Sequence, residues 1–192
     1  YDRLPTSGSV SLKEFKLTMK DIPYDVTVSN SEAVFDPKKI ELKNTRGTIG
    51  KSDFAVAGAV SNYIGYVFGD KEVIKGNVDF DSELLDLNEF MTETEAPATP
   101  TDTVAFGVIP IPDNIDFVLR SSVKTVKMMD YIMTNLSGDI IAKDGIANLS
   151  NVKFNMLGGT FGVNGAYNPK DIAHPTYDFA LKIDGMSIQQ AA

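Results

Sequence analysis

Residues 47–52 end like a phosphate-binding loop, with Gly50, Lys51 and Ser52 in the order that such a loop requires. The motif needs a first glycine, four spacer residues and then Gly-Lys followed by Ser or Thr, placed between a strand and a helix. Thr45 occupies the position of the first glycine, and the alternating residues that follow predict a strand. We therefore expect no nucleotide site here.

His174 is the only histidine, and it could in principle act as a general base. It stands between Ala173 and Pro175, in a segment that we interpret as a surface connection between strands. No residue pattern around it supplies a nucleophile, so the sequence predicts no catalytic residue.

Residues 79–83 place three acidic side chains at alternate positions, Asp79, Asp81 and Glu83, which could offer carboxylates to Ca²⁺. The glycine and the downstream bidentate glutamate of an EF-hand loop are missing. Acidic residues on the outer face of a strand explain the pattern better. We predict neither a metal site nor a cofactor.

Composition narrows the possible partners. The chain has 26 acidic and 18 basic residues, a net charge of -8, which disfavours nucleic acid because its binding needs a basic surface. It contains no cysteine, so disulfides and thiolate metal sites are excluded.

Membrane and export signals are absent from the sequence itself. The apolar runs are far shorter than the roughly 20 residues of a membrane helix, and residues 1–9 do not resemble a signal peptide. We expect the chain to be a piece of a longer protein, whose membrane anchor would lie outside these 192 residues.

Alternation of apolar and polar residues with a period of two dominates the chain, which is typical of strands with one buried face. Residues 54–60, 115–119 and 161–167 show it most clearly. The predicted strands cover residues 9–19, 24–29, 33–35, 40–43, 52–60, 73–81, 113–123, 139–142, 146–151, 159–167 and 177–183. Turns are predicted at 36–37, 44–47, 143–145 and 168–169.

Helix signals are few. Residues 82–91 could form two helical turns capped by Ser82, but Leu85 and Leu87 alternate, so a strand fits equally well. Residues 92–109, which are rich in Thr and Pro, are predicted to be a linker.

The two halves of the chain resemble each other. Residues 31–44 align with residues 137–150, and the pattern Phe-x-Val-x-Gly-Ala at Phe54 recurs at Phe161. We therefore predict a first β repeat at 1–91, a linker at 92–109 and a second β repeat at 110–192. The predicted fold is all-β, an elongated, curved and mostly antiparallel sheet with few or no helices.

The second half resembles the carboxy-terminal region of AsmA-family proteins. The resemblance rests on Asn114-Ile-Asp-Phe-Val-Leu-Arg, Leu136-Ser-Gly-Asp-Ile-Ile-Ala-Lys-Asp-Gly, Val152-Lys-Phe-Asn-Met-Leu-Gly-Gly-Thr-Phe-Gly-Val-Asn-Gly-Ala-Tyr and Tyr177-Asp-Phe-Ala-Leu-Lys-Ile-Asp-Gly-Met-Ser-Ile. It covers residues 110–190. Residues 9–91 follow the same order more loosely, without the Asp-Gly turn and the doubled glycine.

The resemblance implies a non-enzymatic periplasmic β-sheet with an apolar groove, tethered to the inner membrane of a Gram-negative bacterium by a helix that these residues do not include. It further implies a part in outer-membrane biogenesis, in which phospholipid or another acyl-chain ligand moves along the groove and neighbouring repeats of the same chain extend it. The candidate groove residues are Phe54, Val56, Val60, Ile115, Phe117, Leu119, Phe161, Val163 and Tyr167.

Two other interpretations stay open. The same apolar residues could be plain core, because buried strand faces are normally core. The chain would then be a structural or protein-binding β module with a sealed core. An enzyme is the third interpretation, with a single His and no paired-acid signature in its support.

Overall fold

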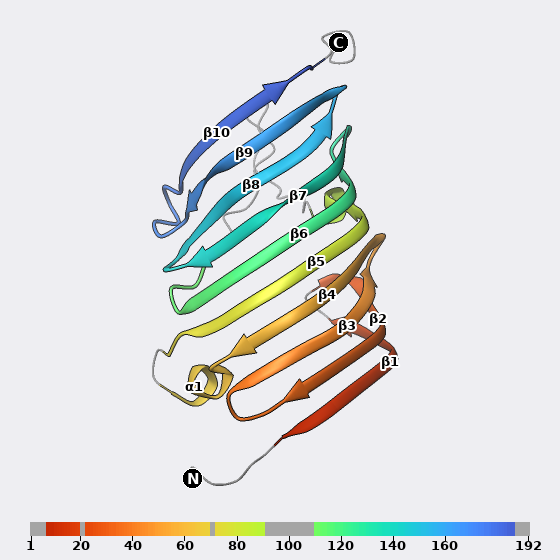
Figure 1. The fold of residues 1–192 in the computed structure, drawn as a ribbon, viewed down its shortest axis with the longest axis vertical. Helices are drawn as coiled ribbons and strands as arrows, with labels where there is room; N and C mark the ends of the chain where they lie inside the picture. Colours follow the sequence, from red (N-terminus) through yellow and green to blue (C-terminus); the bar gives the residue numbers. More distant parts are fainter. Residues whose placement is uncertain (1–6, 20–21, 70–71, 91–109, 187–192) are drawn as a thin grey trace.

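The protein folds as one open β-sheet of ten strands, which follow one another across the sheet in chain order. The computed structural model describes residues 7–90 and 110–186, except residues 20–21 and 70–71. The predicted linker at 92–109 lies outside the described residues. The prediction of an all-β, curved and mostly antiparallel sheet is confirmed (Figure 1).

The first five strands are β1 (Gly8–Met19), β2 (Ile22–Phe35), β3 (Lys39–Ile49), β4 (Ser52–Ser61) and β5 (Ile74–Asp86). The last five are β6 (Ile115–Met128), β7 (Tyr131–Lys143), β8 (Ile146–Met156), β9 (Gly159–Asn168) and β10 (Thr176–Asp184). A short helix, α1 (Tyr63–Phe68), connects β4 to β5, and a 3-10 turn, η1 (Leu87–Phe90), follows β5.

The two sets of five strands correspond closely. β3 and β8 both have 11 residues, and β4 and β9 both have 10. β6, β8 and β9 each begin 107 residues after β1, β3 and β4. All neighbouring strands are antiparallel except β5 and β6, which pair in parallel where the two sets meet. This parallel joint needs the chain to cross over between Asp86 and Ile115.

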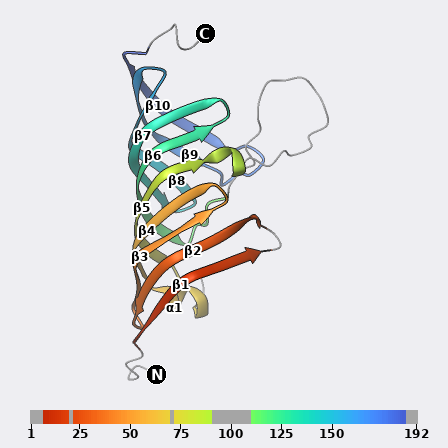
Figure 2. The ribbon, with the colours of Figure 1, turned by 90° about the vertical axis from the view of Figure 1, so that its right-hand side faces the viewer.

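Every strand is long, and the sheet bends along a line that crosses the middle of the strands (Figure 2). Non-glycine residues with positive φ lie along this line within four strands: Glu14 in β1, Asn44 in β3, Asn135 in β7 and Asn151 in β8. The pairing register shifts beside Asn44 and Asn151. Such bulges bend a strand and increase its twist.

The bend corrects two of the sequence predictions. Residues 44–47 do not form a turn but lie inside β3, because Asn44 tolerates the left-handed conformation that the bulge requires. Residues 24–29 and 33–35 are not two strands but parts of β2. The open choice at 82–91 resolves into the end of β5 followed by η1.

Buried side chains are concentrated beside the bend. Val123, Val126 and Met133 form a buried cluster, and residues from both sides of the bend pack against it: Phe80, Leu85, Leu87, Met128, Leu136, Phe154 and Met156. Side chains from two parts of a bent strand converge only on the inner side of the bend. The face that carries this cluster is therefore the inner face of the sheet.

Candidate functional site

The inner face is apolar from one edge of the sheet to the other. The register places one residue of each strand in a row that runs across all ten strands, and every member of the row is apolar. This row, called row B below, consists of Val10, Ala33, Leu42, Gly58, Val78, Leu119, Ile140, Leu149, Gly165 and Phe179.

A second row lies beside it, two residues along each strand. Row A consists of Gly8, Phe35, Ile40, Val60, Gly76, Phe117, Ala142, Ala147, Tyr167 and Tyr177. Neither row contains a charged residue. The two rows therefore form a continuous apolar strip that crosses the strands.

The nine candidate groove residues all lie on this inner face. Val60, Phe117 and Tyr167 belong to row A, and Leu119 belongs to row B. Val56 pairs with Phe80 nearer the bend, while Ile115 pairs with Ile74 at the end of the sheet. Phe54, Phe161 and Val163 lie on the same face and pair with Gly47, Phe154 and Val152.

Not all nine residues are available to a ligand. Phe161 is only 5% exposed, and its ring stacks on Phe154 with a centroid separation of 5.2 Å. Phe161 is therefore part of the core. This agrees with the alternative interpretation, which took all nine candidate residues to be core. Val56 and Val163 are half-buried.

The sequence-based selection missed several members of the strip. Val78 and Leu149 lie in predicted strands and alternate with polar neighbours, so alternation could have placed them on the apolar face, but the selection did not include them. In β7, Ile140 and Ile141 are both apolar, so alternation alone could not decide which of them points inward. The pairing of Ile140 with Leu119 decides it.

A small apolar hollow lies on the inner face next to the bend. It is lined by Ile49, Ser52, Asp53, Phe54, Val56, Phe80, Leu85 and Phe90. Its volume is about 290 Å³. The hollow is open on one side, so it widens the apolar strip toward η1.

The opposite face is charged, and its ion pairs are arranged around β6. Arg120 pairs with Asp79 of β5, and Lys124 pairs with Glu83 of β5 at 2.8 Å. Lys143 of β7 pairs with Asp116 at 3.1 Å. A hydrogen bond from Arg120 lowers the pKa of Asp79 below its ordinary value. The sheet therefore presents one apolar face and one face that water can solvate.

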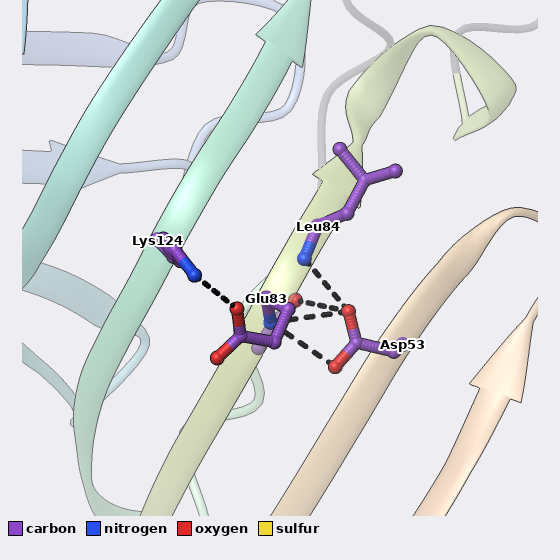
Figure 3. A network of polar contacts seen from close by, with 5 residues as sticks. Asp53, Glu83, Leu84 and Lys124 are labelled. Carbon is purple, nitrogen blue, oxygen red and sulfur yellow. Dashed lines mark hydrogen bonds and ion pairs between the residues drawn. The ribbon is translucent and has the colours of Figure 1, made fainter.

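Side chains replace the backbone pairing that is lost along the bend. The Asp53 carboxylate accepts hydrogen bonds from the N–H groups of Glu83 (3.1 Å) and Leu84 (2.7 Å), and from the Ser82 hydroxyl (Figure 3). Burial raises the pKa of Asp53, but these hydrogen bonds outweigh it and leave the pKa below its ordinary value. In β9, Asn164 similarly accepts a hydrogen bond from the Asn151 N–H at 2.7 Å.

The segment that resembles a phosphate-binding loop is a β-hairpin turn. β4 begins at Ser52, where a nucleotide site would need a helix. The Lys51 N–H, which would face a phosphate, donates to the Glu89 carboxylate at 2.9 Å. A carboxylate already fills this position, so the turn offers no place for an anion.

The other candidate chemical groups are also accounted for. His174 is exposed between β9 and β10, and its Nδ1 lies 3.1 Å from the Asp171 carboxylate. Within the described part of the chain, no three His, Asp or Glu side chains are placed to hold a metal ion. No helix among the described residues is long and apolar enough to cross a membrane.

Comparisons with known proteins add no relative: no protein-family model, curated protein or solved structure matches this chain.

Proposed function

We propose that the protein binds the acyl chains of lipids along its inner apolar face and has no catalytic activity. The observation that carries this proposal is row B, in which ten successive strands each contribute an apolar residue. Within the described residues, no second sheet packs over this face. An apolar surface without a protein cover needs another apolar partner.

The size of the strip suits this ligand. Neighbouring strands are about 4.8 Å apart, so a row across ten strands is roughly 43 Å long. The hydrocarbon core of a bilayer is about 30 Å thick, so an acyl chain in one leaflet extends about 15 Å. The strip can hold more than one acyl chain end to end.

The chemistry of the strip favours tails over headgroups. Each methylene transferred from water to an apolar surface contributes about 0.8 kcal/mol. Rows A and B offer no charged side chain that could select a headgroup. We therefore expect lipids to bind by their tails, with little preference among headgroups.

The wider role is proposed from the sequence resemblance. We propose that the chain is a periplasmic segment of an AsmA-like protein, anchored in the inner membrane of a Gram-negative bacterium through a segment outside these residues, and that it takes part in outer-membrane biogenesis by carrying phospholipid. The open apolar face supports this proposal because a carrier must release its cargo along a continuous path.

The rival proposal is a structural or protein-binding module with a sealed core. A sealed core requires the apolar strip to be covered by protein, whereas Leu119, Val78 and Ile140 at its centre are only half-buried. A protein partner that covers the strip would bury these three residues and so satisfy the rival proposal. The test below therefore separates lipid from protein as the bound material.

Leu119→Asp and Val118→Asp form the matched pair for this test. Both residues are half-buried in β6, but they point to opposite faces, so only Leu119→Asp puts a charge on the strip. We expect phospholipid to copurify with the wild-type protein from bacterial cells, and with Val118→Asp, but not with Leu119→Asp. Mass spectrometry of the extracted lipid gives the molar ratio, and circular dichroism verifies that each variant is folded.

A second measurement uses purified protein. A fluorescent fatty acid should bind to delipidated wild-type protein and to Val118→Asp, and bind at least about tenfold more weakly to Leu119→Asp, since burying an unpaired charge is costly. If Leu119→Asp does not fold, Phe179→Ser at the exposed end of row B replaces it. Equal binding by a folded strip variant and the control would refute the proposal.

A further inference from the structure

Both ends of the sheet have an unpaired edge strand within the described residues. β1 pairs with β2 alone and β10 pairs with β9 alone, and the two strands lie at opposite ends of the sheet (Figure 1). An unpaired edge presents a row of free N–H and C=O groups that can pair with another strand.

The apolar inner face continues to both edges. Four alternating side chains in each edge strand are between 37% and 61% exposed. They are Val10, Leu12, Phe15 and Leu17 in β1, and Tyr177, Phe179, Leu181 and Ile183 in β10. Each edge therefore combines free backbone groups with an uncovered apolar stripe.

The joint between β5 and β6 shows how two such edges fit together. β5 is the last strand of the first five and β6 is the first strand of the second five, and they pair in parallel from Ile74–Ile115 to Asp86–Lys127. β10 and β1 occupy the corresponding places at the two ends of the sheet. β10 also runs in the same direction as β1. Of the nine pairings between them, one is parallel and eight are antiparallel, and an even number of reversals restores the original direction.

We propose that copies of this chain associate head to tail, with β10 of one copy paired in parallel with β1 of the next. The occupant of each edge is thus a second copy of the same chain. This inference does not depend on lipid binding. Because the contact joins two different surfaces, it leaves a free edge at each end and produces open-ended oligomers.

The rows set the register of this contact. Val78 faces Leu119 in row B, so Phe179 of one copy should face Val10 of the next. Phe80 faces Ser121 one step nearer the bend, so Leu181 should face Leu12. The apolar strip would then run without interruption from one copy to the next.

The outer face supplies a charge test of the same register. Asp81 pairs with Ser122 in the joint between β5 and β6, and the corresponding residues at the proposed contact are Lys182 and Lys13. The two lysines would repel each other and weaken the association, although Lys182 also pairs with Asp184 of its own strand at 3.0 Å. Reversing either charge should therefore strengthen it.

Cross-linking tests the contact directly, because the chain has no cysteine of its own. Under mild oxidation, the double variant Leu12→Cys/Leu181→Cys should give a ladder of covalent dimers, trimers and higher oligomers. The matched control Ser11→Cys/Leu181→Cys places one thiol on the opposite face and should give no ladder. The single variant Leu12→Cys should give at most a dimer.

Sedimentation velocity of the full 192-residue chain over a range of concentrations provides the second readout. Lys13→Glu and Lys182→Glu should each tighten association about two- to fivefold, the range expected for an exposed charge pair. The double variant, which again places like charges opposite each other, should return to the wild-type value.

Three outcomes would overturn the proposal. One is a monomer at every soluble concentration with no ladder from the double cysteine variant. Another is a Leu12→Cys dimer as abundant as the ladder, which would show symmetric pairing of β1 with β1. The third is cross-linking only to other proteins, which would make the edge a site for a different chain.

Discussion

The aromatic ring of Phe117 lies over Gly76, its direct partner on the neighbouring strand of the parallel joint. A Cβ at Gly76 would overlap the ring, with Cζ of Phe117 only 2.9 Å away. The same arrangement recurs on the inner face, where Phe35 covers Gly8 and Phe54 covers Gly47. Aromatic rings thus cover glycines on adjacent strands and extend the apolar strip over bare backbone.

Gly76→Ala should destabilise the protein by about 1–3 kcal/mol, because the new methyl group forces Phe117 out of its place. The matched control is Gly162→Ala in β9, where an added Cβ has its nearest neighbour 3.8 Å away. That substitution should be neutral or stabilise by up to about 1 kcal/mol. Urea unfolding followed by circular dichroism measures both. Equal losses of unfolding free energy in the two variants would show that the position of the Phe117 ring does not depend on the missing Cβ at Gly76.

Asn151 marks the bend in β8 with a φ of 53°, a conformation that favours asparagine or glycine. Asn151→Gly should keep the stability of the wild type within about 0.5 kcal/mol, because glycine adopts positive φ readily. Asn151→Val should cost about 1–2 kcal/mol, because a β-branched side chain is strained in the left-handed region. Thermal unfolding of both variants distinguishes them. A loss with Asn151→Gly as large as with Asn151→Val would contradict the conformational argument.

Asn44, the residue of β3 that corresponds to Asn151, should respond in the same way. Its φ is 49°, and its carbonyl accepts a hydrogen bond from the Asn30 side chain at 3.2 Å. Asn44→Val should therefore cost about 1–2 kcal/mol and Asn44→Gly almost nothing. Different responses at the two positions, measured by the same thermal unfolding, would mean that the two bends are not equivalent.

Asp53 joins β4 to β5 at the bend, and Asp53→Ala should lower the free energy of unfolding by about 2 kcal/mol, the magnitude of hydrogen bonds to a charged group. Lys124→Ala on the exposed Lys124–Glu83 pair is the control and should cost clearly less, because water and salt screen an exposed ion pair. Urea titration at neutral pH compares them. The prediction fails if the two losses are the same.

The contribution of Asp53 should also depend on pH. Its pKa is lowered in the folded protein from an ordinary value of 3.8, so the unfolded chain binds the proton more tightly. The stabilisation is therefore fully present above pH 3.8 and is lost as the pH falls through the lower pKa of the folded state. The difference in stability between the wild type and Asp53→Ala should shrink on acidification below that pH. A difference that is constant or grows would contradict the role of the carboxylate.

Alternation and turn residues were enough to predict the fold class and most strand positions. Alternation at 54–60, 115–119 and 161–167 is a local property, since successive side chains of a strand point to opposite faces whatever the strand pairs with. It therefore placed all nine candidate residues on faces that are apolar. The repeated pattern around Phe54 and Phe161 also identified strands that correspond in length, β4 and β9.

Tertiary structure alone decided how these faces join into one strip. The order of the strands, the parallel joint at β5 and β6 and the register that aligns Val78, Leu119 and Ile140 depend on hydrogen bonds between residues far apart in the chain. The bend could not be predicted either. Asn44 in a sequence signals a turn, and only pairing on both sides of β3 holds it inside a strand.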